Sequence, residues 1–109
     1  MNLKEARQSF LKERRATRRP SPHTLSAYDS DLLALERFLG SDFAVQRLDE
    51  AQIVSFLTFM IDGGLKAATV RRRAIVVRLF SRWLASSGRL LRDPWGDLPL
   101  ADGLAPDPG

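Results

Sequence analysis

Apolar residues recur every three to four positions along most of this chain, and no stretch alternates apolar and polar residues with period two. The first spacing is typical of an amphipathic helix and the second of a strand, so we predict four helices and no strand. The first helix covers residues 3–18. Its apolar positions, Leu3, Ala6, Phe10 and Leu11, form a thin stripe that predicts weak packing at the edge of the fold.

The second predicted helix has the clearest boundaries. Ser21 suits the N-cap, Pro22 suits the first helical position because its missing N–H needs no partner there, and Gly40 suits the C-cap. Between them one apolar stripe is formed by Leu25, Tyr28, Leu32, Leu35 and Leu39. We therefore expect Tyr28 to belong to the core rather than to act as a nucleophile.

The third helix is predicted to begin near Asp49 and to end at Gly63–Gly64. Its buried side is predicted to consist of Ile53, Phe56, Leu57 and Met60. The fourth helix covers residues 67–86, a length of about 30 Å, and stops at Gly88.

The last part of the chain, DPWGDLPLADGLAPDPG, is rich in Pro, Gly and Asp and predicts an irregular tail. Trp95 and Leu98 are expected to fold back on the helices. Residues 100–109 have the composition of a linker.

Charge is distributed in four blocks. Residues 1–20 carry +5, residues 21–65 carry −5, residues 66–92 carry +8 and residues 93–109 carry −4, which gives the net charge of +4. Two basic blocks around an acidic one predict a directional positive surface, whose commonest partner is a phosphate backbone.

The composition, 44% hydrophobic and 28% charged, is typical of a globular domain, and cysteine is absent. The start MNLKEARQSF carries charges where a signal peptide has its apolar region, and no apolar run is long enough to cross a bilayer. We therefore expect a cytoplasmic protein without a membrane partner.

On a helical wheel of about 100° per residue, the fourth helix has two different sides. One stripe, predicted to face the core, consists of Val70, Ala74, Val77, Phe80 and Leu84. Arg71, Arg78 and Arg82 fall within roughly 40° of one another on the far side. No acid occurs between Gly63 and Arg92, so ion pairs within the helix are impossible. This side predicts a face for nucleic acid or an acidic partner; the alternative is that the arginines only keep an apolar helix soluble.

His23 and Thr24 fall in the first turn of the second helix, where free N–H groups and the helix dipole favour a phosphate. For Thr24, capping alone is the alternative. A single His without neighbouring Cys, His or carboxylates predicts no metal site. The Ser and Thr residues lack a His base in a triad arrangement and no Gly-rich phosphate loop occurs, so we expect no catalytic centre and no cofactor.

The runs SPHTLSAYDSDLLALERFL and ATVRRRAIVVRLFSRWLASSG resemble the second and fourth helices of the core-binding domain of tyrosine recombinases, the family of phage integrases and Xer-type enzymes. In that family a Ser-x-x-Thr-hydrophobic-x-x-Tyr start opens the second helix, and the fourth commonly reads Thr-hydrophobic-x-Arg-Arg. DPWGDLP is similar to the family's Asn/Asp-Pro segment. The resemblance extends from the first helix to Pro99.

The resemblance implies an all-α fold: a four-helix SAM-like bundle with an irregular C-terminal tail, clamping one face of a recombination half-site in double-stranded DNA. Its second and fourth helices would meet neighbouring parts of the major groove. Carried over by position, the residues that approach DNA are Thr24, Ser26 and Ala27, and then Ala68, Arg71, Arg72 and Val76, with Lys66, Thr69 and Arg78 as phosphate contacts. Arg72 is our first choice for a base contact, because a guanidinium can pair bidentately with guanine.

The family's catalytic Arg, Lys, His-x-x-Arg and nucleophilic Tyr belong to a separate C-terminal domain. This sequence has one His, at position 23, and one Tyr, at position 28. We therefore expect residues 1–99 to form a DNA-binding domain that does not cut DNA, and residues 100–109 to begin the linker to an absent catalytic domain. The resemblance also implies other recombinase protomers in a synapse as partners, often through the first helix, and a bacterial or phage origin.

Two other functions fit the residues. One is a helical protein–protein adaptor whose basic groove binds an acidic segment. The other is a small helix-turn-helix regulator, which fits less well because it needs a tight turn before its recognition helix. Residues 44–48 and the full third helix do not supply that turn.

Overall fold

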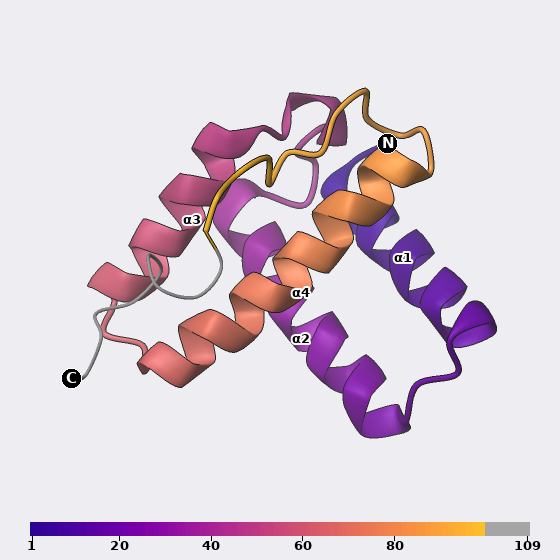
Figure 1. Ribbon diagram of the computed structural model, residues 1–109, viewed down its shortest axis with the longest axis horizontal. Coiled ribbons are helices and arrows are strands. Elements are labelled where there is room, and N and C mark those ends of the chain that lie inside the picture. Colours follow the sequence, from indigo (N-terminus) through magenta and orange to yellow (C-terminus); the bar gives the residue numbers. More distant parts are fainter. Residues whose placement is uncertain (100–109) are drawn as a thin grey trace. The chain divides into compact units, whose positions relative to one another are not determined.

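The computed structural model describes residues 1–99, which contain four α-helices and no strand (Figure 1). The helices are α1 (Leu3–Thr17), α2 (Pro22–Leu39), α3 (Glu50–Asp62) and α4 (Ala67–Ser86). A short 3-10 helix, η1 (Val45–Arg47), lies between α2 and α3 and was not expected from the sequence. The all-α class and the four helices are confirmed, and the predicted linker lies outside the described residues.

The described residues divide into two compact parts, residues 1–47 with α1 and α2, and residues 48–99 with α3 and α4. Within residues 1–99, no helix combines the length and the apolar character that a membrane span requires.

In the first part, α1 packs along α2. Leu3, Ala6 and Phe10 of α1 are buried, and the ring of Phe10 lies 6.3 Å from the ring of Tyr28 on α2. The backbone before α1 is also tied down, because the N–H of Leu3 donates to the carbonyl of Phe43 at 2.9 Å. The first helix is therefore held more firmly than its thin apolar stripe predicts.

Both helices of this part begin at a side-chain cap. Asn2 and Glu5 form a capping box at α1, with distances of 2.8 and 2.9 Å between each side-chain oxygen and the other residue's backbone nitrogen. At α2 the predicted cap is confirmed, since the hydroxyl of Ser21 accepts from the backbone N–H of Thr24 at 3.1 Å. Gly40 ends α2 with a φ of 106°, a conformation that glycine adopts without strain.

Arg7 on α1 joins two carboxylates of α2. Its Nε donates to Glu36 at 3.0 Å and an NH group donates to Asp29 at 2.5 Å, while the hydroxyl of Ser41 donates to the other oxygen of Glu36 at 3.1 Å. Burial by itself lowers the pKa of Arg7, but the hydrogen bonds and charges of Glu36 and Asp29 outweigh it and raise that pKa above its ordinary value. Arg7 therefore stays charged and connects the two helices.

In the second part, α3 packs against α4. Asp49 is the N-cap of α3: its side chain accepts from the backbone N–H of Ala51 at 2.9 Å, and Gln52 completes a capping box. The predicted buried side of α3 is confirmed in full, since its buried residues are Ile53, Phe56, Leu57 and Met60.

After α4 the chain folds back at Trp95, which is only 2% exposed. Its indole N–H donates to the carbonyl of Leu98 at 2.8 Å, and its backbone N–H donates to the carboxylate of Asp93 at 2.9 Å. The predicted return of Trp95 to the core is confirmed, while the side chain of Leu98 is half-buried.

Substitution of Arg7 by Met should lower the free energy of unfolding by about 3 kcal/mol, because Glu36 would remain buried without its partner. Urea unfolding followed by circular dichroism measures the change. Arg37→Met is the control: this arginine is exposed and makes no ion pair with residues 1–99, so its removal should change stability by less than about 0.5 kcal/mol. Equal stability of the two variants would show that the network does not hold α1.

Trp95→Ala should cost about 3–5 kcal/mol, because it removes a large buried ring and leaves a cavity. Leu91→Ala, four residues earlier, removes a fully exposed side chain and should leave the melting temperature unchanged. A Trp95→Ala protein as stable as wild type would show that Trp95 does not pack in the core.

Candidate nucleic-acid interface

α4 buries about half of its circumference, as a helical wheel of its buried positions shows. These positions are Val70, Ala74, Val76, Val77, Phe80, Ser81, Trp83 and Leu84. All five members of the predicted core stripe are among them, so that prediction is confirmed.

The prediction for Val76 is wrong. It was expected to approach DNA, but its side chain is only 3% exposed. On the wheel it lies about 20° from Trp83, which is buried as well, so the buried arc is wider than the predicted stripe. Val76 is therefore a core residue, and its side chain is not available to a duplex.

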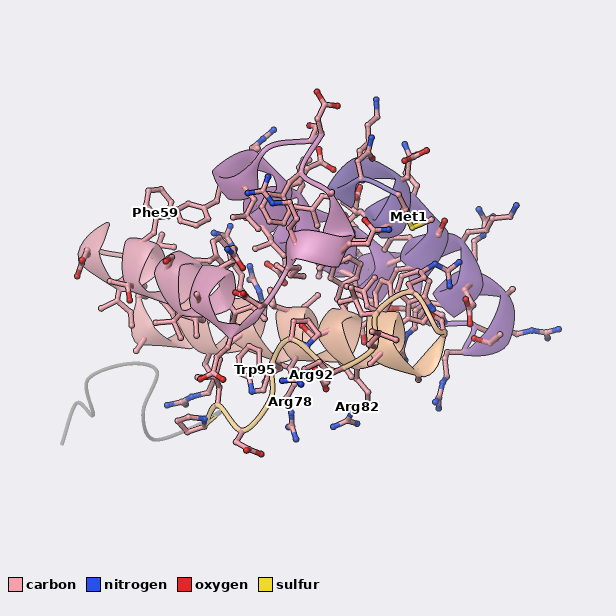
Figure 2. All side chains as sticks on the ribbon, turned by 90° about the horizontal axis from the view of Figure 1, so that it is seen from above. Met1, Phe59, Arg78, Arg82, Arg92 and Trp95 are labelled. Carbon is pink, nitrogen blue, oxygen red and sulfur yellow. The ribbon has the colours of Figure 1, made fainter. Side chains whose placement is uncertain are left out.

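The opposite side of α4 is cationic. Arg71, Arg72 and Arg82 are exposed and Arg78 is half-buried. Figure 2 shows Arg78 and Arg82 projecting away from the ribbon of α4 on the same side. Arg71, Arg78 and Arg82 form no ion pair with any residue in the range 1–99. Ile75, 42% exposed, lies between them on the helix surface.

The first turn of α4 adds to this positive side. Lys66 is the N-cap residue, makes no capping hydrogen bond with its side chain and is exposed, and no acid lies in the first turn. The backbone N–H groups there, together with the helix dipole, favour an anion. Ala68 and Thr69, both predicted to contact DNA, lie in this first turn. Ala68 is exposed and Thr69 is half-buried.

The predicted contacts on α2 lie in the first part of the chain. His23 and Ser26 are exposed, while Thr24 and Ala27 are half-buried. The hydroxyl of Thr24 is 2.9 Å from the hydroxyl of Ser21, and the backbone N–H of Thr24 also donates to the Ser21 hydroxyl oxygen. The polar groups of Thr24 are thus engaged in the cap, which favours the capping alternative for this residue.

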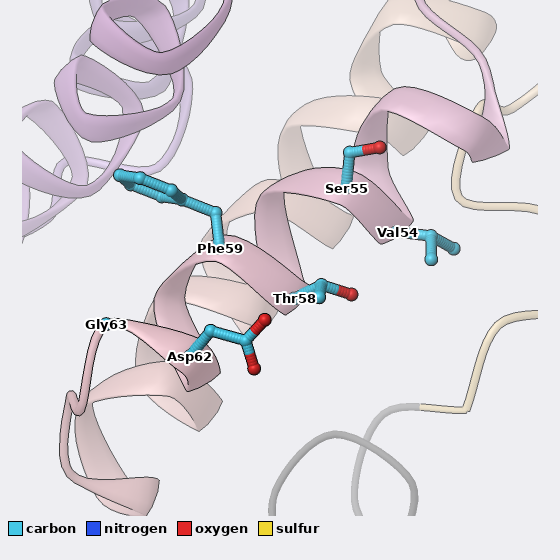
Figure 3. A pocket seen from close by; sticks show the side chains of 6 residues that line it. All are labelled: Val54, Ser55, Thr58, Phe59, Asp62 and Gly63. Carbon is cyan, nitrogen blue, oxygen red and sulfur yellow. The ribbon is translucent and has the colours of Figure 1, made fainter.

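Two surface hollows differ in charge. One, of about 500 Å³ on α3, is lined by Val54, Ser55, Thr58, Phe59, Asp62 and Gly63 (Figure 3). Its only charged residue is acidic, so it does not suit a phosphate. The other, of about 440 Å³, lies between α1 and α2 and includes Lys12 and Arg15, which no motif in the sequence marks as functional.

Residues 8–88 match the family model of the phage integrase N-terminal SAM-like domain. The chain belongs to this family. The resemblance to the N-terminal domain of tyrosine recombinases is thereby confirmed, together with the SAM-like fold. No solved structure matches the chain.

Several tyrosine recombinases are similar to the chain. XerD of Agrobacterium fabrum is 38% identical over 92 residues, which covers 82% of this chain and 27% of that protein. XerC of Xanthomonas campestris pv. campestris (strain B100) is 34% identical over 87 residues, covering 78% and 27%. XerC of Chlorobaculum parvum is 30% identical over 93 residues, covering 78% and 28%. The chain therefore spans about a quarter of the length of these relatives.

Val76→Ala should lower the free energy of unfolding by about 1–2 kcal/mol, because it deletes buried methyl groups. Ile75→Ala removes an exposed side chain from the adjacent position and should cost much less. Thermal unfolding of both variants makes the comparison. A Val76→Ala protein with wild-type stability would show that the Val76 side chain is not part of the core.

Proposed function

We propose that this domain binds double-stranded DNA as the core-binding domain of a tyrosine recombinase. The observation that carries the proposal is the outward side of α4. There Arg71, Arg78 and Arg82 are held on a helix whose opposite side is buried, and no ion pair within residues 1–99 neutralises them. A surface of this kind suits a phosphate backbone, because each neutralised phosphate releases condensed counterions.

Different residues would serve different roles in such a complex. Lys66 and Thr69, at the first turn of α4, suit phosphate contacts, because the helix dipole adds to the charge of the lysine. Arg71 and Arg72 are exposed within the first turns of α4 and suit base edges in the major groove. Ala68 is small and exposed, so the backbone can approach the duplex closely.

The α2 residues would add a second contact to the same half-site. Ser26 and His23 are exposed there, and Ser26 can donate to or accept from a base edge or a phosphate oxygen. Thr24 contributes mainly by capping the helix. Strand exchange belongs to the proposed whole protein, whose catalytic residues would lie in a C-terminal domain, and other protomers would join it on the recombination site.

Replacing Arg78 and Arg82 together by Gln should weaken binding to every duplex and reduce the slope of log Kobs against log salt by about 2, or roughly 0.9 per lost phosphate contact. Fluorescence anisotropy with a labelled 30-base-pair duplex measures both quantities. The control is Lys4→Gln with Arg37→Gln, which removes the same charge from exposed positions of the first part.

Two outcomes would contradict the proposal. One is a chain that is not retained on any duplex at low salt but binds an Asp-rich peptide, which is the behaviour of the adaptor alternative. The other is an equal loss of affinity in the two double variants, which would reduce the role of α4 to its contribution to net charge.

A further inference from the structure

The hollow between α1 and α2 combines an apolar floor with a cationic rim. It is lined by Leu11, Lys12 and Arg15 of α1 and by Leu25, Ser26 and Asp29 of α2. Leu11 and Leu25 are half-buried, whereas Lys12, Arg15 and Ser26 are exposed. The volume is about 440 Å³, and all of its walls belong to the first part of the chain.

The two cations of this hollow are not used within the fold. Arg7 is engaged by Asp29 and Glu36, and the guanidinium of Arg14 lies 5.2 Å from the centre of the Phe10 ring. Lys12 and Arg15, in contrast, make no ion pair with any residue from 1 to 99. The first part thus leaves these two charges facing solvent.

Lys12 and Arg15 are three positions apart, so their side chains are neighbours on one side of α1. Glu13 lies about 100° or more around the helix from each of them. The hollow contains one carboxylate, that of Asp29, which also pairs with Arg7 at 2.5 Å and faces two cations at the rim. The balance at the rim is therefore positive.

Attraction to the helix dipole would account for a cation in the last turn of α1, where Arg14 and Arg15 lie. It does not account for Lys12, which precedes that turn. Nor does it account for the position of both cations around Ser26, a residue that the proposed function places against DNA.

We propose that Lys12 and Arg15 bind backbone phosphates of the duplex beside Ser26, which makes α1 a DNA-contacting helix. The inference rests on the proposed function and extends it to residues outside α2 and α4. The two cations neutralise phosphates, and the floor of Leu11 and Leu25 accommodates the deoxyribose between them. Such contacts fix the position of the protein on the duplex but carry no base sequence.

The test is the double variant Lys12→Gln and Arg15→Gln in the 109-residue chain, with salt-dependent anisotropy on two labelled duplexes of unrelated sequence. The salt slope should fall by about 2 on both duplexes, and the affinity should fall by the same factor on both. Lys4→Gln with Arg37→Gln is the control: it removes equal charge from exposed positions of α1 and α2 outside the hollow. Circular dichroism establishes that all proteins fold alike.

The outcomes separate this inference from the proposed function. If wild type binds duplex DNA and the double variant has the same slope as the control, the inference is wrong and the proposed function stands. If wild type binds no duplex at low salt, the proposed function fails and the inference fails with it. If the double variant loses affinity only for an Asp-rich peptide and keeps its affinity for DNA, the hollow belongs to an acidic polypeptide and the inference is overturned.

Discussion

The structure depends on the two different sides of α4, one buried and one cationic. One half of the circumference is sealed by aliphatic and aromatic side chains, and the other half carries arginines for which the helix contains no acid. Like charges on one helix reduce its stability, and here the buried half offsets that cost. The positive charges are consequently carried on a core element rather than on a loop, which keeps their positions defined before any partner arrives.

The distribution of acids explains why so much positive charge remains available. Several acids of the block at residues 21–65 are engaged within the fold or buried in it. Asp29 and Glu36 engage Arg7, Asp49 caps α3, and Asp31 is completely buried. Within residues 1–99, none of these carboxylates forms an ion pair with Lys12, Arg15, Arg71, Arg78 or Arg82. The surface is therefore more basic than the net charge of +4 suggests.

Membership of the integrase SAM-like family gives this arrangement a functional context. A domain that covers about a quarter of a recombinase needs no catalytic residues of its own if its role is to hold the duplex. In that role its chemistry would consist of positioned cations and small polar groups on helices. In the proposed complex, phosphate contacts would supply affinity and register, while side chains that reach base edges would supply sequence preference.

The sequence by itself determined the four helices, the caps of α2, the start of α3 and most of the buried positions. Ser21, Gly40 and Asp49 marked helix ends correctly, because capping depends on atoms within three or four residues. Apolar spacing identified the core stripe of α4 for the same local reason. The motifs of the second and fourth helices led to the correct family, since they are read directly from the order of residues.

Only the tertiary structure decided how wide the buried arcs are and which charges meet. A wheel gives the angle of Val76 but not how much of the helix its neighbours cover, so its burial was missed. Arg7 and Glu36 are 29 residues apart, and Lys12 and Ser26 line one hollow only because α1 packs along α2. Pairings over such separations leave no periodic signal in a single sequence, because they arise from the packing of whole helices.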